Sequence, residues 1–169
     1  EAYIDFSEQP SWLEKLKRFP NLIITQTLSK AYGLAGIRLG VCYGSKEIIK
    51  TLNSIKPPYN VNELTQQKAI ERLSKTDEVE KEVSEIIHQR DAVLKSLKEV
   101  SFIKKIYPTE CNFVLVKVDD ATKRYDQLRT KGIVVRNRTT QALCENCLRF
   151  TIGTALENEK LLSVLNELK

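Results

Sequence analysis

Residues 25–40, TQTLSKAYGLAGIRLG, are the most informative stretch of this sequence. They follow the apolar run NLIIT at 21–25, which predicts a strand in a sheet that is covered on both faces. A single lysine, Lys30, comes just after that predicted strand, in a turn rich in hydroxyls and glycines, and Arg38 follows within the same stretch. The position of this lysine decides how the rest of the chain is interpreted.

The glycines of this stretch do not match the common nucleotide-binding motifs. Gly33, Gly36 and Gly40 are spaced G-x-x-G-x-x-x-G, which differs from the G-x-G-x-x-G fingerprint of dinucleotide-binding proteins. The sequence also lacks the G-x-x-x-x-G-K-[ST] pattern of a P-loop. Both kinds of nucleotide site are therefore excluded here.

Thr27, Ser29, Lys30 and Arg38 instead form a pattern suited to a phosphorylated aldehyde. The guanidinium supplies charge and bidentate geometry for a phosphate, and the hydroxyls supply neutral donors. A lysine beside that anchor, shielded by apolar neighbours, becomes nucleophilic as the free amine. The pattern favours a Schiff base with pyridoxal phosphate. The alternative is a surface lysine in a hairpin-like turn with an unrelated arginine nearby.

The composition is typical of a globular protein without a membrane anchor. The chain has 169 residues, of which 41% are apolar and 29% charged, enough for one ordinary domain or two small ones. No apolar run approaches about 18 residues, and residues 1–10 lack the pattern of a signal peptide, so we expect a cytoplasmic protein. The net charge of +5 does not indicate a nucleic-acid partner, because lysines and glutamates are interleaved without a basic stripe.

Four cysteines raise the question of a redox or metal site. Cys144 and Cys147 form a C-x-x-C pair, which could be a redox pair or half of a zinc site. The pair leads into a predicted strand instead of opening a helix, and Cys42, Cys111 and His88 are scattered along the chain. We therefore expect ordinary reduced thiols and no metal site.

The proline-containing segment 56–62, KPPYNVN, divides the chain into two predicted parts. Before it we expect a strand at 2–6, a short helix at 11–19 capped by Ser11, strands at 21–28 and 37–44, and a helix at 45–55. After it we expect one helix from 63 to about 98, strands at 102–108 and 112–118, a helix at 121–132, strands at 133–137 and 147–153, and a helix at 157–168. The fold class is therefore α/β: the end of one α/β domain, a linker, and a small α/β (α+β) domain with helices on one side of its sheet.

Residues 27–40, TLSKAYGLAGIRLG, closely resemble the cofactor-lysine motif of the fold type I aminotransferases, within the histidinol-phosphate aminotransferase branch. Further matches in the order of that family are EAY at 1–3, PPYNVN at 57–62, NFVLVKV at 112–118 and LRFTIGT at 148–154. The resemblance covers essentially the whole chain, whereas members of the family are longer. It implies the C-terminal part of the large pyridoxal-phosphate-binding domain in residues 1–58 and the small C-terminal domain, with its long spine helix, in residues 59–169.

The resemblance assigns a role to each residue that matches the family motif. Lys30 resembles the lysine that holds pyridoxal 5′-phosphate and moves a proton between substrate and cofactor. Thr27, Ser29 and Arg38 match the phosphate-binding positions, and Tyr3 resembles the tyrosine that hydrogen-bonds the ring oxygen O3′.

Two arginines near the end of the chain match substrate-binding positions. Arg149 resembles the arginine that clamps the anionic group of the substrate. Arg136 is a candidate for the same pocket, although its VVRNR context also fits a solvent-facing strand end.

The implied activity is a transamination in histidine biosynthesis, between glutamate and imidazole-acetol phosphate, by a homodimer. An aromatic aminotransferase, a phospho-amino-acid decarboxylase on the same scaffold and a non-catalytic interaction domain stay open as alternatives.

The chain also departs from the family pattern. The family reads D-E-A-Y at the tyrosine, and this chain begins at the glutamate, without the aspartate that would pair with the pyridine nitrogen. It contains no methionine, so we expect it to be a piece of a longer protein. The glycine-rich phosphate loop, the aromatic residue that stacks on the ring and the N-P-x-N-P-x-G segment of the family are not in the sequence. We therefore expect this chain alone to be inactive and to bind pyridoxal phosphate weakly or not at all.

Overall fold

The structure is a computed structural model that describes residues 1–168. The chain packs as two compact units, which we call unit 1 (residues 1–83) and unit 2 (from residue 84 onward). Both combine helices and strands, so the mixed α/β class is confirmed. The predicted domain boundary at residues 58/59 concerns the longer proteins of the family and stays a prediction.

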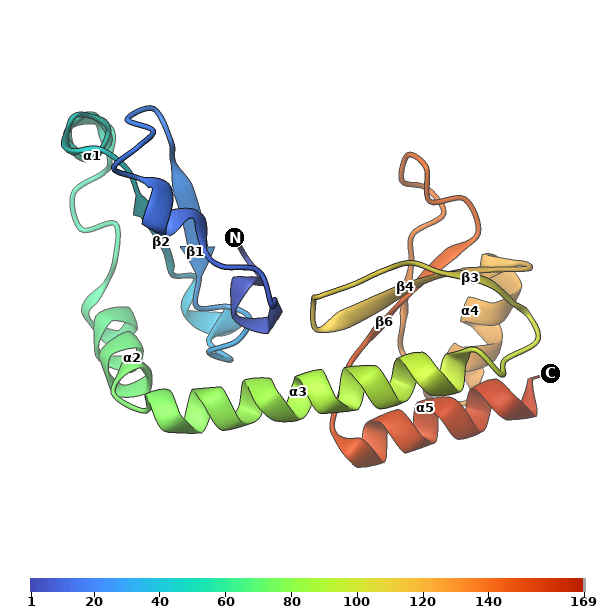
Figure 1. Cartoon of the computed structure of the whole chain (residues 1–169). Coiled ribbons are helices and arrows are strands. Elements are labelled where there is room, and N and C mark those ends of the chain that lie inside the picture. Colours follow the sequence, from blue (N-terminus) through green and yellow to red (C-terminus); the bar gives the residue numbers. More distant parts are fainter. Residues whose placement is uncertain (169) are drawn as a thin grey trace. The chain divides into compact units, whose positions relative to one another are not determined.

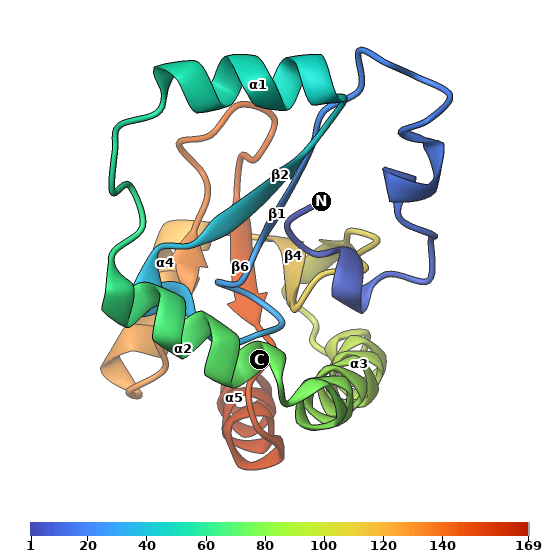
Figure 2. The same ribbon diagram turned by 90° about the vertical axis from the view of Figure 1, so that its left-hand side faces the viewer.

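A two-stranded hairpin forms the centre of unit 1. Strands β1 (Ile24–Thr27) and β2 (Gly40–Tyr43) pair antiparallel, with Thr27 opposite Gly40. The Ser45 hydroxyl accepts the Ile48 N–H at 3.4 Å and caps helix α1 (Lys46–Ile55), as predicted. Figures 1 and 2 show α1 at one end of the hairpin and helix α2 (Glu63–Leu73) at the other. Segment 56–62 contains neither helix nor strand, as predicted, although the two compact units divide at residues 83/84.

The first predicted strand, at residues 2–6, is wrong. A 3₁₀ turn, Ile4–Phe6, replaces it, in which the Phe6 N–H donates to the Tyr3 carbonyl at 3.1 Å. A strand needs a neighbouring strand for its backbone groups, and this segment satisfies them locally while it buries the Phe6 ring. The short helix after it is also 3₁₀ (Trp12–Lys15), and the predicted Ser11 cap is confirmed by its bond from the Leu13 N–H at 3.1 Å.

In this chain the strand predicted at 21–28 is not covered on both faces. Only Ile24 among the four residues of β1 is buried, Thr25 is exposed, and the preceding Ile23 is 50% exposed. A continuous apolar strand is typical of a sheet with layers on both sides, and the described chain supplies a single partner strand.

The single helix predicted from 63 to about 98 is in fact two helices, α2 and α3 (Thr76–Leu97). The break lies at Ser74, whose hydroxyl donates to the Glu71 carbonyl at 2.8 Å and thus competes with the helical backbone. Beside it, the Arg72 guanidinium donates to the Tyr32 carbonyl at 3.0 Å and pairs with Glu82. The apolar periodicity alone does not reveal this local competition.

Unit 2 contains a four-stranded antiparallel sheet in the order β3-β4-β6-β5. Figure 1 labels three of its strands, β3, β4 and β6. Its strands confirm the predicted pattern, although the strand expected at 133–137 is reduced to its last two residues. The strands are β3 (Ile103–Ile106), β4 (Phe113–Val118), β5 (Arg136–Asn137) and β6 (Cys147–Thr151), and the helices that follow β4 and β6 are α4 (Ala121–Thr130) and α5 (Ala155–Glu167).

One face of this sheet is buried under helices. Alternate side chains of β4 and β6, Val114, Val116 and Phe150 among them, are fully buried against side chains of α3, α4 and α5. Phe113, Leu115 and Lys117 lie on the opposite face, which is only partly covered. The predicted arrangement, with helices on one side of the sheet, is therefore found in unit 2.

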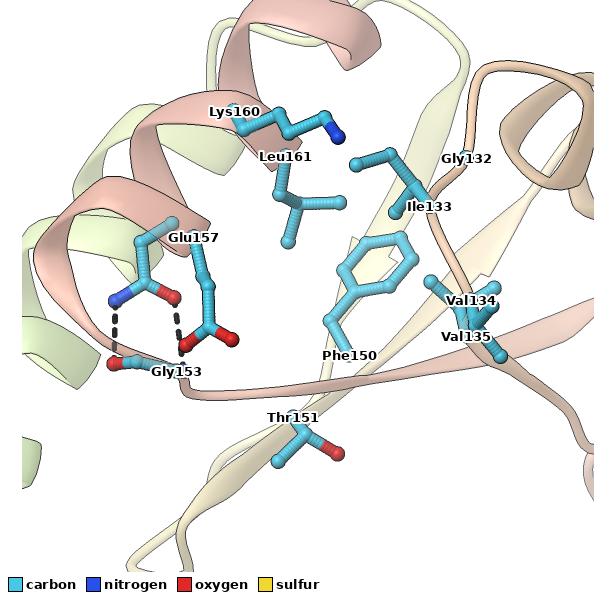
Figure 3. A pocket seen from close by; sticks show the side chains of 11 residues that line it. Gly132, Ile133, Val134, Val135, Phe150, Thr151, Gly153, Glu157, Lys160 and Leu161 are labelled. Carbon is cyan, nitrogen blue, oxygen red and sulfur yellow. Dashed lines mark hydrogen bonds between the residues drawn. The ribbon is translucent and has the colours of Figure 1, made fainter.

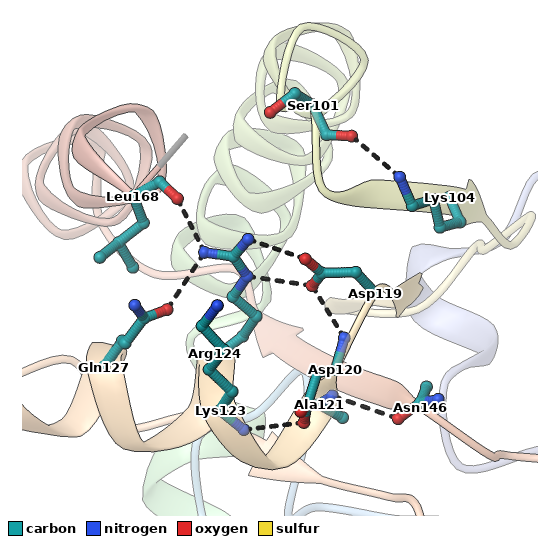
Figure 4. Close-up of polar contacts among 10 residues, drawn as sticks. All are labelled: Ser101, Lys104, Asp119, Asp120, Ala121, Lys123, Arg124, Gln127, Asn146 and Leu168. Atoms are coloured by element: carbon teal, nitrogen blue, oxygen red, sulfur yellow. Dashed lines mark hydrogen bonds and ion pairs between the residues drawn. The ribbon is translucent and has the colours of Figure 1, made fainter.

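A buried arginine, Arg124, connects three elements at the edge of this core (Figure 4). Arg124 on α4 donates to the two carboxylate oxygens of Asp119 at 2.8 and 3.0 Å and to the Leu168 carbonyl at 2.7 Å. Its guanidinium also lies 4.1 Å from the centroid of the Phe102 ring. These hydrogen bonds lower the pKa of Asp119 from 3.8 to about 2. The ion pair thus connects the end of β4 with α4 and the end of α5.

Candidate functional site

Lys30 follows β1 in a tight turn of unit 1. The Lys30 carbonyl accepts the Gly33 N–H at 2.9 Å, and Gly33 has φ +68°, which a glycine adopts without strain. The Lys30 side chain is exposed, so the expected shielding by apolar neighbours is not found within the described residues. Its ammonium lies 5.5 Å from the centroid of the Tyr3 ring, within the range of a cation–π contact. Two of the predicted cofactor residues therefore lie side by side.

The three predicted phosphate-binding residues lie at one end of the hairpin. Because Thr27 is opposite Gly40, the connection between the strands carries both Ser29 and Arg38. The Thr27 hydroxyl accepts the Ser29 N–H at 3.1 Å and donates to the Leu39 carbonyl at 3.4 Å. The hydroxyl of Thr27 therefore shapes the turn that presents Ser29 and Lys30.

Arg38 has an unusual backbone for an arginine. Its φ is +55°, in the left-handed region that favours glycine, directly after the 3₁₀ turn Ala35–Ile37. One guanidinium nitrogen donates to the Ala35 carbonyl at 2.8 Å, and the side chain is exposed. Strained residues are concentrated at ligand sites, where surrounding structure holds them in place. The strain at Arg38 therefore supports a binding role at this end of the hairpin.

A carboxyl group that sequence reasoning missed lies near Thr27. Asp5 lines a cavity of about 180 Å³ together with Thr27, Tyr32 and Tyr43. Partial burial raises the pKa of Asp5, and burial together with this carboxylate raises the pKa of Tyr32. The sequence offers little signal for this cluster, because its members come from three separate segments.

Arg149 and Arg136 lie opposite each other on neighbouring strands of unit 2. Opposed side chains on one face of a sheet have Cβ atoms about 4.5–5.5 Å apart, and like charges in such a pair destabilise it. The buried Nε of Arg149 has no hydrogen-bond partner among the described residues, and its guanidinium lies 4.9 Å from the centroid of the Phe113 ring. An anion between the two arginines would relieve both the repulsion and the unsatisfied donor. The two predicted substrate residues thus form one candidate anion site.

A larger cavity of unit 2 is not lined by any predicted site residue. It has a volume of about 430 Å³ and lies between α5 and the segment 132–135, with Phe150 on its wall (Figure 3). Its carboxylate, Glu157, already accepts the Thr154 N–H and hydroxyl at 2.8 Å in the cap of α5. The cavity is also lined by Lys160, but neither the resemblance to the family nor the spacing of the sequence assigns a role to any of its residues.

The cysteines remain free thiols in the described part of the chain. As predicted, the C-x-x-C pair leads into a strand, β6. Within residues 1–168, no cluster of three or more His, Cys, Asp or Glu side chains could hold a metal ion. None of the described helices is long and apolar enough to cross a membrane.

Comparisons with known proteins agree with the sequence motifs. A family model described as "Aminotransferase class I and II" matches residues 1–166. The histidinol-phosphate aminotransferase of Flavobacterium johnsoniae is 66% identical over 169 residues, which are 100% of this chain and 48% of the relative. The chain thus spans about half the length of the curated relatives it matches.

Solved structures extend the similarity to three dimensions. The histidinol-phosphate aminotransferase from Clostridium acetobutylicum superposes with a TM-score of 0.92 at 29% identity, covering 99% of this chain and 52% of that one. The enzyme of the same name from Sinorhizobium meliloti, solved in complex with pyridoxal-5′-phosphate, has a TM-score of 0.86 at 24% identity, covering 100% of this chain and 48% of its own. The second likeness concerns the fold alone. The resemblance expected from residues 27–40 is confirmed.

Proposed function

The chain belongs to the aminotransferase class I and II family, and from this membership we propose that it is the part of a transaminase that carries the cofactor lysine. We infer that the longer protein moves an amino group between glutamate and imidazole-acetol phosphate, in histidine biosynthesis. The observation that carries the proposal is the connection of the β1–β2 hairpin, where Lys30 lies beside Tyr3 among phosphate-binding side chains. The 66% identity to a histidinol-phosphate aminotransferase supports the choice of substrate.

The residues at the end of the hairpin fit pyridoxal phosphate. Ser29 and Arg38 offer a hydroxyl and a guanidinium to a phosphate group, and the strained backbone of Arg38 supports a built binding position. The exposed Lys30 amine is accessible to an aldehyde. The family match over residues 1–166 supports the same assignment.

Pyridoxal phosphate, when bound, supplies an electron sink for the electron pair left on the substrate carbon. In this proposal Lys30 holds the cofactor through its amine and moves the proton at the substrate carbon. Tyr3 donates a hydrogen bond to the ring oxygen O3′, and Thr27, Ser29 and Arg38 hold the phosphate.

Arg149 and Arg136 are proposed to bind the anionic group of the substrate. The unsatisfied buried Nε of Arg149 and the opposition of two positive charges support an anion there. A planar guanidinium matches a carboxylate or phosphate with two parallel hydrogen bonds.

The proposal includes the organisation of the longer protein. Residues 1–58 belong to its large cofactor-binding domain and residues 59–169 to its small domain, and it acts as a homodimer in the cytoplasm. The proline-containing segment 56–62 supports the division, because neither helix nor strand crosses it.

The test is a substrate comparison on the full-length protein. We expect amino transfer from glutamate to imidazole-acetol phosphate to exceed transfer to phenylpyruvate and decarboxylation of a phospho-amino acid. A preference for phenylpyruvate would favour an aromatic aminotransferase, and release of carbon dioxide would favour a decarboxylase. If the full-length protein has none of these activities, it is a non-catalytic interaction protein.

A variant of Arg149 tests the anion site. Charge-assisted hydrogen bonds contribute about 1.5–3 kcal/mol, so Arg149→Ala should raise KM about tenfold or more and leave the absorbance of the bound cofactor unchanged. Arg149→Lys should recover little of the loss, because a point charge does not replace the planar fork. The exposed Arg129→Ala is the matched control and should leave KM unchanged. Loss of the cofactor absorbance in Arg149→Ala would move this residue out of the substrate site.

A further inference from the structure

The turn in front of β6 brings the two cysteines of the C-x-x-C pair together. The Cys147 N–H donates to the Cys144 carbonyl at 3.0 Å, which closes a four-residue β-turn. The end residues of such a turn have Cα atoms less than about 7 Å apart, and disulfides span Cα distances of about 4.4–6.8 Å. The backbone therefore holds the pair at a separation that a disulfide can bridge.

The backbone around the pair is strained and firmly held. Leu143 and Asn146 have φ values of +62° and +55°, so a left-handed residue lies on each side of Cys144 within the loop. A left-handed backbone is rare for a branched apolar residue, and the Leu143 side chain is 91% exposed and gains no burial there. Strain of this kind persists where surrounding structure maintains it.

Contacts from β4 and α4 fix the turn. The Asn146 carbonyl accepts the Val118 N–H at 2.8 Å, and its side-chain oxygen accepts the Ala121 N–H at 3.3 Å. The turn is thus fastened at the point where β4 ends and α4 begins. It keeps its shape through these bonds and not through a bond between the cysteines, which are both free thiols.

The two thiols have complementary environments. Cys144 is half-buried and accessible from solvent, whereas Cys147 is fully buried. Burial raises the pKa of Cys147, while the Tyr107 hydroxyl donates a hydrogen bond to its sulfur and opposes this effect. In a reactive dithiol pair one thiol is accessible and reacts first. The other thiol is protected and then closes the disulfide.

We propose that Cys144 and Cys147 are a reversible disulfide site on the strand that carries Arg149. In the first step the Cys144 thiolate attacks a small soluble disulfide, forms a mixed disulfide and releases one thiolate. In the second step Cys147 gives its proton to the thiolate released in the first step, and its sulfur attacks the sulfur of Cys144 and releases the second thiolate. The two cysteine sulfurs are oxidised, and the soluble disulfide is reduced to two thiols.

The test is a redox titration of the full chain in buffers with different ratios of reduced to oxidised glutathione. After acid quenching and alkylation, trypsin releases both cysteines in one peptide, residues 139–149, while Cys42 and Cys111 lie in other peptides. We expect an unalkylated peptide, lighter by the two thiol hydrogens, to form in oxidising buffer and to revert in reducing buffer. A peptide that carries two alkyl groups at every ratio would overturn the proposal.

The isolated peptide 139–149 is the matched control. It contains both cysteines but lacks the contacts with β4 and α4 that hold the turn, so it shows how readily the disulfide forms without them. Preorganisation removes the ordering cost of the ring, so the folded chain should form the disulfide with an equilibrium constant about tenfold or more above that of the peptide. An equal or smaller constant would show that the turn is not built for this bond.

Single variants separate the two thiols. Cys147→Ser should trap glutathione on Cys144, and Cys144→Ser should leave Cys147 reduced because it is buried. Cys111→Ser should not change the titration. Glutathione on Cys147 in the Cys144→Ser chain would contradict the assigned order of attack. These readouts need no cofactor or substrate, so they stand apart from the proposed transamination.

Discussion

The two units of this chain bury their apolar side chains to very different degrees. Unit 2 closes a core between its four-stranded sheet and three helices, with Leu97, Leu128 and Leu165 fully buried. In unit 1, helix α1 buries none of its side chains, and Ile55 is 73% exposed. A cavity of about 470 Å³ is lined by Ile49, Leu52 and Ile55 along this helix.

The difference follows from the number of strands. A two-stranded hairpin is marginal alone, whereas three or more strands with a packed face are stable. The predicted cofactor lysine lies on the unit that does not complete its own core, and the predicted substrate arginines lie on the unit that does. The stable scaffold and the reactive group are thus carried by different units.

The largest expected difference concerns folding in isolation. A chain of residues 63–169 keeps α2, α3 and the whole core of unit 2, so it should unfold cooperatively with heat and bind little of a hydrophobic dye. Residues 1–58 alone should show no cooperative transition and strong dye binding, because their apolar faces remain uncovered. Circular dichroism and dye fluorescence measure both. A cooperative unfolding transition for residues 1–58 would contradict the expected difference between the two parts of the chain.

Single substitutions of apolar residues should also destabilise unit 2 more than unit 1. Phe150→Ala removes a fully buried ring from unit 2 and should lower its free energy of unfolding by about 3–5 kcal/mol. Ile55→Ala removes a mostly exposed side chain from α1 and should change stability by less than about 0.5 kcal/mol. Urea titrations of the full chain give both values. Equal losses would mean that unit 1 has a core of its own.

The buried ion pair should matter more than an exposed pair in the same helix. Arg124→Gln removes the bonds to Asp119 and Leu168 and should cost about 1.5–3 kcal/mol. Arg129→Gln breaks the exposed pair with Asp126 and should cost less than about 0.5 kcal/mol. A small effect of Arg124→Gln would show that the end of α5 is held by packing alone.

Acid should act on the two units in opposite directions. Asp119 in unit 2 has a pKa of about 2 in the folded chain against an ordinary 3.8, so its stabilising contribution is present above 3.8 and is lost as the pH falls towards 2. Asp5 in unit 1 has a raised pKa, so its ionisation opposes folding, and protonation relieves that penalty as the pH falls through the raised value. Asp119→Asn and Asp5→Asn should remove the respective dependence from urea titrations at stepped pH. If the contributions of Asp119 and Asp5 to stability changed in the same direction with pH, the assigned pKa shifts would be wrong.

The smallest expected effect on stability belongs to the residue with the largest expected effect on function. Lys30 is exposed and contacts only the Tyr3 ring among the described contacts, so Lys30→Ala should change the free energy of unfolding by less than about 0.5 kcal/mol. The same substitution in the full-length protein should abolish turnover. A large loss of stability would mean that Lys30 is a structural residue.

The sequence predicts the fold well where local signals and packing agree. The strand predicted at 112–118 is β4 to within one residue, and Ser45 caps α1 where the sequence places it. It fails where a distant partner decides the outcome. Residues 2–6 have the composition of a strand but form a 3₁₀ turn, because no neighbouring strand pairs with them.

The candidate site shows the same limit. The motif around Lys30 predicts which residues share the end of the hairpin, because they are close in sequence. The cavity that joins Asp5 to Thr27 and Tyr43, and the register that opposes Arg136 to Arg149, depend on tertiary structure and leave no local pattern.

The most direct test of the account is to locate the covalent link to the cofactor. The full-length protein loaded with pyridoxal phosphate is reduced with borohydride, digested and mapped by mass spectrometry. We expect the pyridoxyl group on Lys30 and on no other lysine, and its loss in Lys30→Ala. A pyridoxyl group on Lys46 or Lys50, the next lysines along the chain, would contradict it.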